Sequence, residues 1–208
     1  QAREALLTVD PATQPAEQVR LQLLTLAGLD IEQRDFAAAL ANIIAYETTF
    51  ETDAASTGLR AYLELYAGRY ERARELIETT PQGEPALASA ILLAQTSALQ
   101  GDDAAFERAT QRATTQAPEN ALAWYWRGIY EVSAGGAGAA QARAPFERAV
   151  ELNPQATNAW AALGQIRSVS GEADEALAAF DRALAVDPQE PFAIAGKAYV
   201  YLQMDRID

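Results

Sequence analysis

Residues Trp160–Pro188 read WAALGQIRSVSGEADEALAAFDRALAVDP, and this stretch decides the fold class. Its apolar residues recur at intervals of three and four, the spacing of residues that share one face of a helix. Gly171 interrupts the pattern and Pro188 ends it, because glycine favours turns and proline lacks the amide hydrogen that a helix needs. The stretch therefore predicts two short amphipathic helices joined by a tight turn.

The same pattern of two helices recurs along the chain at intervals close to 34 residues. Five residues in equivalent helix positions are separated by 33, 34, 36 and 34 residues: Tyr62, Gln95, Ile129, Gln165 and Tyr199. The one long interval contains the glycine-rich segment 135–138, which fits a two-residue insertion in a turn. Repeats of this length, each made of two helices, are typical of an α-solenoid. The sequence thus predicts an all-α solenoid of antiparallel helix pairs.

The spacing of particular residues resembles the tetratricopeptide repeat family, whose signature runs W-x2-L-G-x2-Y, then A-x3-F, then P. The unit quoted above matches at Trp160, Leu163, Gly164, Ala176, Phe180 and Pro188, with Arg167 in place of the tyrosine. The preceding unit matches at Trp124, Gly128, Ala142, Phe146 and Pro154. The resemblance implies a right-handed superhelical α-solenoid in which first helices line an inner groove and second helices lie outside.

We expect one solenoid over residues 1–208. The complete repeats are predicted at about 20–53, 54–86, 87–120, 121–156 and 157–190, with partial repeats at 1–19 and 191–208. Because the chain begins and stops inside a repeat, the sequence indicates a segment of a longer array. Truncated repeats leave apolar faces uncovered, so self-association is predicted through Leu6 and Leu7 at one end and Tyr201, Leu202 and Ile207 at the other.

Composition narrows the classes of function. The formal net charge of -13 disfavours nucleic acids and anionic membrane surfaces as partners. The chain has neither Cys nor His, so thiolate nucleophiles, histidine bases and the usual zinc ligands are missing. Lys197 is the only lysine, and no apolar run of about 18 residues that could span a membrane occurs. We expect no catalysis, no cofactor and no metal site.

Two features that could indicate a ligand site have plainer explanations. The acidic residues fall at predicted helix starts, where carboxylates are favoured by the helix dipole; they are Asp102, Asp103, Glu172, Asp174 and Glu175. The glycines of 135–138 follow no strand and precede no GK[ST] motif, so a lengthened turn is favoured over a phosphate-binding loop.

The predicted partner-binding residues lie on first helices, at positions that the packing signature does not use. They are Tyr62, Tyr66, Gln95, Tyr125, Ile129, Asn158, Gln165, Phe192 and Tyr199. Tyrosines and amides suit an extended peptide because they offer flat contact area and hydrogen bonds at low entropic cost. The alternative interpretation is that Tyr62, Tyr66 and Tyr199 are half-buried packing residues.

Helix geometry places Trp124 and Trp126 of the aromatic cluster on different faces of one predicted helix. Trp124 occupies the packing position of the signature. Trp126 lies about 200° further round the helix, so it either packs on a neighbouring helix or is exposed for binding, and packing is favoured.

The same helix also bears on one specialised function of the family. Members that grip a C-terminal carboxylate use basic residues at positions that here hold Tyr125, Ile129, Ala161 and Gln165, so that function is not expected.

The sequence therefore predicts a scaffold that binds a peptide or protein segment in its concave groove. Two alternatives stay open: a spacer or assembly module of a larger bacterial protein, such as an exopolysaccharide-export or envelope-assembly scaffold, and an accessory domain of a repeat-containing transferase. The preference for Arg over Lys and the high alanine content are typical of a GC-rich bacterium. Periplasm and cytoplasm are both compatible with the sequence, and it does not identify the partner.

Overall fold

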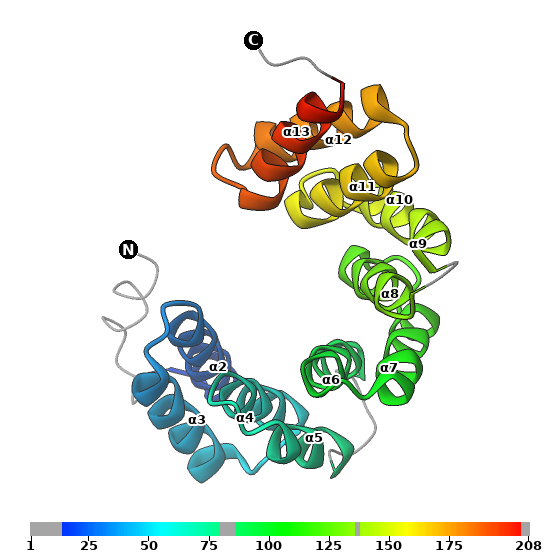
Figure 1. Cartoon of the computed structure of the whole chain (residues 1–208). Coiled ribbons are helices and arrows are strands. Elements are labelled where there is room, and N and C mark those ends of the chain that lie inside the picture. The colour runs from blue at the N-terminus through cyan, green and yellow to red at the C-terminus, as the bar shows by residue number, and fades with distance from the viewer. Residues whose placement is uncertain (1–13, 80–85, 136–137, 205–208) are drawn as a thin grey trace. The chain divides into compact units, whose positions relative to one another are not determined.

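The computed structural model describes residues 14–79, 86–135 and 138–204. These residues form α-helices joined by short turns, and no strand occurs among them (Figure 1). The helices are α2 (Ala16–Glu32), α3 (Phe36–Phe50), α4 (Ala54–Tyr66), α5 (Tyr70–Thr79), α6 (Ala86–Gln100), α7 (Asp103–Gln116), α8 (Ala121–Ser133), α9 (Gly138–Gln141), α10 (Arg143–Leu152), α11 (Thr157–Val169), α12 (Ala173–Val186) and α13 (Pro191–Gln203). The proposed contact residues Leu6, Leu7 and Ile207 lie outside the described part.

The chain divides into two compact units, residues 1–100 and 101–208. In the first unit α2 packs with α3 and α4 with α5, and in the second α11 packs with α12. The predicted all-α solenoid of helix pairs is confirmed. The boundary between the units falls inside the predicted repeat 87–120, between α6 and α7. A single solenoid over the whole chain stays a prediction.

Short polar side chains fix where several helices begin. The Asp35 side chain accepts a hydrogen bond from the Ala38 amide at the start of α3. Asp102 does the same for Ala105 at the start of α7. These amides have no partner inside the helix, so a side-chain acceptor in front of it stabilises the first turn. The capping role that the sequence indicates for Asp102 is thus observed.

The helix that leads to Pro154 is interrupted, which the sequence analysis did not predict. A four-residue helix α9 ends at Gln141, and α10 begins at Arg143. Pro145 explains the break, because it has no amide hydrogen for the Gln141 carbonyl and its ring crowds that carbonyl. Glu172 stands at the start of α12, but its side chain makes no cap hydrogen bond to that helix. It instead accepts a hydrogen bond from Arg143 at 2.5 Å.

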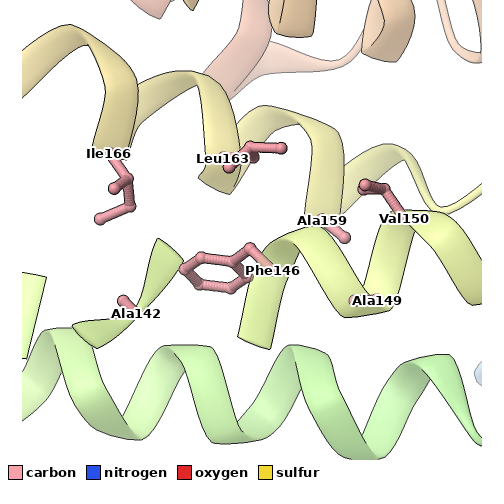
Figure 2. Packing of buried hydrophobic residues seen from close by; sticks show 7 residues of the cluster. All are labelled: Ala142, Phe146, Ala149, Val150, Ala159, Leu163 and Ile166. Atoms are coloured by element: carbon pink, nitrogen blue, oxygen red, sulfur yellow. The ribbon is translucent and has the colours of Figure 1, made fainter. Parts of the chain in front are cut away.

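One phenylalanine in each of the last two complete repeats forms the centre of the core. Phe146 is fully buried among Ala142, Ala149 and the α11 residues Leu163 and Ile166 (Figure 2). Phe180 is equally buried between α11, α12 and α13. These are the aromatic positions of the repeat signature, and burial of such a ring excludes roughly 150–250 Å² from water in general. Each helix pair therefore depends on its neighbour for a covered apolar face.

Glycines make room for these rings. A Cβ placed at Gly128 would lie 2.5 Å from the Phe146 ring, and one at Gly164 would lie 2.6 Å from the Phe180 ring. Gly196, which the sequence analysis did not single out, approaches Phe180 from α13, where a Cβ would meet the same ring more closely still.

Trp126 packs on a neighbouring helix, as predicted. Its ring meets Phe106 of α7 in an edge arrangement, with centroids 6.2 Å apart. In the next two repeats the positions equivalent to Trp126 hold Ala162 and Gly196. Ala162 packs against the cluster around Phe146, and Gly196 lies against Phe180. One repeat earlier, the position equivalent to Phe146 holds the smaller residue Thr110. A large residue on α8 thus accompanies a small one on α7.

A polar network joins three helices of the first unit. Tyr46 of α3 is fully buried, and its hydroxyl accepts a hydrogen bond from Arg20 Nε at 2.7 Å and donates one to Asp53. Arg20 Nη2 also bonds Asp53 at 2.5 Å. Asp53 in turn forms a capping box with Ser56 at the start of α4. Neither periodicity nor the repeat signature predicted this network, because its members are 26 and 33 residues apart.

Candidate partner-binding groove

A pocket of about 400 Å³ lies among α8, α11 and the start of α13 in the second unit. Nine residues line it: Tyr125, Ile129, Asn158, Ala161, Ala162, Gln165, Glu190, Pro191 and Phe192. Pockets of this size and mixed character are typical of binding sites. Five of the nine partner-binding residues predicted from the sequence line this one pocket.

A second pocket of about 340 Å³ adjoins the first and shares Tyr125 and Asn158 with it. It adds Leu122 from α8 and residues of the turn before α11, among them Asn153 and Gln155. We call the two together the α8–α11 groove. Two adjoining pockets suit an extended chain segment, because such a segment presents successive side chains to successive pockets.

Helix geometry places the groove residues on one face. Asn158, Ala161 and Gln165 are three and four residues apart on α11, so their side chains lie one above the other. Asn158 and Gln165 are exposed, while Ala161 is buried and forms a small floor between them. Polar amides therefore flank an apolar base.

Tyr125 both packs and lines the groove. Its ring lies 6.0 Å from that of Phe146 and 5.7 Å from that of Trp126, centroid to centroid. Burial raises the pKa of the Tyr125 hydroxyl, and the negative charge of Glu190 raises it further. The phenol is therefore neutral and available as a hydrogen-bond donor.

The start of α13 supplies the remaining wall. Phe192 follows Pro191 in the first turn and is 64% exposed, so its ring is free for contact. Glu190 is only 7% exposed, and its Oε2 accepts a hydrogen bond from the Ala193 amide. Phe192 was among the predicted binding residues, but Glu190 was missed. The signal was its position at the beginning of the next repeat, beside Phe192.

Tyr199 does not line either pocket. It lies further along α13, is 52% exposed, and accepts a hydrogen bond from Gln203 Nε2 at 3.0 Å. The register argument grouped it with Ile129 and Gln165, yet the groove described above ends at the first turn of α13.

The other three predicted residues lie together in the first unit. Tyr66 is 54% exposed and stacks between two rings, with centroids 5.7 Å from Phe36 and 6.1 Å from Tyr62. Burial and the neighbouring Tyr66 raise the pKa of Tyr62, while a hydrogen bond with the Gln95 side chain acts in the opposite direction. Tyr62 also packs against the core around Ala61. Phe36 was not among the predicted binding residues, so its place in this stack was missed.

Groups that would support other chemistry are missing from the described residues. No cluster of three or more acidic, Cys or His side chains suited to a metal ion occurs in this part of the chain. Across the same residues, no helix combines the length and apolar character needed to cross a membrane.

Comparison with known proteins agrees with this architecture. A family model described as tetratricopeptide repeat matches residues 137–191. The thermophilic tetratricopeptide repeat protein TTC0263 of Thermus thermophilus is 21% identical, with 88% of this chain and 99% of that chain covered at a TM-score of 0.72. No match was found among curated proteins.

Two further solved structures extend the comparison. YrrB, whose structure is described as that of a tetratricopeptide repeat protein with an unusual peptide-binding site, is 16% identical over 94% of this chain and 99% of its own, with a TM-score of 0.58. MamA from AMB-1 is 25% identical over 72% of this chain and 88% of its own, with a TM-score of 0.56.

The fold and the groove define an α-solenoid of helix pairs. Residues 137–191 match the tetratricopeptide repeat model, and the helix pairs have the fold of solved tetratricopeptide repeat structures. Repeats of this family are generally non-catalytic interaction modules.

Proposed function

We propose that this protein binds an extended segment of a protein partner in the α8–α11 groove and performs no chemistry on it. The observation that carries the proposal is the convergence of Tyr125, Ile129, Asn158, Gln165 and Phe192 on one pocket. These residues are remote in sequence, and packing between repeats does not require the exposed ones among them.

The character of the groove supports binding over a purely structural role. A spacer needs covered apolar faces between repeats and has no use for an exposed aromatic ring beside a pocket. Phe192 is such a ring, and aromatic side chains at the edge of a pocket commonly dominate binding energy. YrrB shares the fold and has a peptide-binding site, so peptide binding is compatible with this architecture.

The test is selection of random twelve-residue peptides displayed on phage against the full 208-residue chain. Affinities of selected peptides would then be measured by fluorescence anisotropy for the unmodified protein, Phe192→Ala and Ile194→Ala. Ile194 is exposed on the same helix but lines neither pocket, so it is the matched control. We expect Phe192→Ala to weaken binding roughly tenfold or more and Ile194→Ala to leave it unchanged. Peptides that bind both variants equally would contradict the proposal.

A further inference from the structure

The charged lining of the larger pocket is negative. Of the described residues that line it, Glu190 is the only charged one, and none is an Arg or a Lys. The other polar lining groups are the Tyr125 hydroxyl and the amides of Asn158 and Gln165, whose oxygens can accept hydrogen bonds. The pocket thus presents one carboxylate together with neutral groups that can both donate and accept hydrogen bonds.

The Glu190 carboxylate is held in place before any partner arrives. Its Oε2 accepts a hydrogen bond from the Ala193 amide in the first turn of α13. Among the described residues no donor reaches Oε1, and no basic side chain forms an ion pair with Glu190. Glu190 as a whole is only 7% exposed and lines the pocket, so a donor that enters the pocket can reach its carboxylate.

Two arginines of the second unit already have acidic partners away from the pocket. Arg143 pairs with Glu172 at 2.5 Å, and Arg167 lies 3.5 Å from Glu147. No ion pair among the described residues involves Glu190, so a cation of a bound segment would be its first basic partner there. The net charge of -13 adds a long-range attraction for a basic segment.

The apolar lining favours a cation that is carried on an apolar side-chain stem. Ile129 and Ala162 offer an apolar wall, and the exposed Phe192 ring lies at the same pocket. An arginine side chain combines an apolar stem with a planar cation that stacks on aromatic rings and donates in two directions. A lysine would supply the charge but not the planar fork.

We propose that the pocket takes an arginine side chain of the bound segment, with its guanidinium on Glu190 Oε1 and its stem against Phe192 and Ile129. This inference rests on the proposed function, since it names the chemistry of the segment in the α8–α11 groove. The occupant is thus a basic, arginine-containing stretch of a protein partner, not an acidic one.

The test uses the peptides selected on the full chain. Each arginine in a selected peptide would be replaced in turn by citrulline, which keeps the shape but removes the charge. At one position we expect citrulline to weaken binding to the unmodified protein roughly 10- to 100-fold, as for loss of a charge-assisted hydrogen bond. On Glu190→Gln the two peptides should bind almost equally, because the charge that distinguishes them is gone.

A second pair of variants avoids any effect on the start of α13. Gln165 is exposed and caps nothing, so Gln165→Lys and Gln165→Glu should both fold, which circular dichroism would verify. The lysine should weaken arginine-dependent binding by repulsion, and the glutamate should strengthen it.

The outcomes separate the two proposals. Arginine dependence that disappears in Glu190→Gln supports the inference. Peptides that need Phe192 but tolerate citrulline at every arginine, or that are enriched in acidic residues, overturn the inference and leave the groove function standing. Absence of any peptide that depends on Phe192 overturns both.

Discussion

The ring of Phe180 approaches the backbone of Gly164 so closely that a Cβ there would lie 2.6 Å from its Cε1 atom. No ordinary carbon contact is that short, so the ring occupies the space that a side chain would need. The same ring faces Gly196, and one aromatic side chain therefore sets the approach of two helices. This arrangement leads to the first prediction.

Gly164→Ala should destabilise the second unit by about 1–3 kcal/mol, because overpacking a filled core forces the ring or the helices to move. The matched control is Gly58→Ala in the interior of α4, where a Cβ would meet nothing within 4 Å. That change should be neutral or stabilising by about 0.4–1 kcal/mol, since it reduces the entropy of the unfolded chain. Chemical denaturation followed by circular dichroism measures both. Equal effects of the two substitutions would refute the packing argument.

Tyr46→Phe should lower the stability of the first unit by about 1 kcal/mol, the typical contribution of a buried hydrogen-bonding group. The hydroxyl is the group through which Tyr46 bonds both Arg20 and Asp53, and the ring itself stays in place. Tyr66→Phe is the control, because Tyr66 is exposed and its hydroxyl has no hydrogen bond within the described residues. Hydrogen exchange of the α3 and α4 amides would locate the effect; faster exchange confined to the second unit would argue against it.

Acid should weaken the first unit through Asp53. Burial acts to raise the pKa of Asp53, but hydrogen bonds from Tyr46, the Ser56 amide and Arg20 together outweigh it, and the pKa lies below its ordinary value of 3.8. The associated stability is fully present above pH 3.8 and is lost as the pH falls through the lowered value, because the unfolded chain takes up the proton first. Asp53→Asn should be less stable at neutral pH and should lose less on acidification. Urea midpoints measured from neutral to strongly acidic pH would show this; identical pH profiles for the two proteins would exclude a role for Asp53.

Tyr125→Phe should weaken binding of a groove peptide several-fold, as for loss of one neutral hydrogen bond, while leaving the melting temperature nearly unchanged. The ring contacts with Phe146 and Trp126 survive the substitution, and the hydroxyl makes no hydrogen bond to a described residue. Tyr125→Ala is less informative, because it also removes packing from the core. A large fall in melting temperature for Tyr125→Phe would show that the hydroxyl is structural instead.

Most of the helices could be predicted because their signals are local. The two helices predicted on either side of Gly171 are observed as α11 and α12, and Gly171 has the positive φ of 80° that glycine favours. The break at Ala142 was missed although Pro145 is visible in the sequence, since the register of Phe146 and Ala149 continues through it. Periodicity reports which face is apolar and is insensitive to one missing backbone hydrogen bond.

The candidate site was predictable only in part. The repeat register placed Ile129 and Gln165 in equivalent positions, and both line the larger pocket. Tyr199 shares that register but does not line the pocket, because no following helix pair among the described residues forms a wall beside it. The role of Glu190 depends on its burial against the first turn of α13, and burial of a single carboxylate cannot be read from spacing.

The sequence by itself determined the helix pairs, the period near 34 residues and the residues committed to packing, because each follows from spacing along one chain. Only the tertiary structure decided which exposed residues share a pocket and that Glu190 faces it with no basic partner among the described residues. It also decided that Arg20, Tyr46 and Asp53 form one network. The physical reason is that these relationships are between groups on different helices. They depend on distances of a few ångströms that side-chain packing sets and periodicity does not encode.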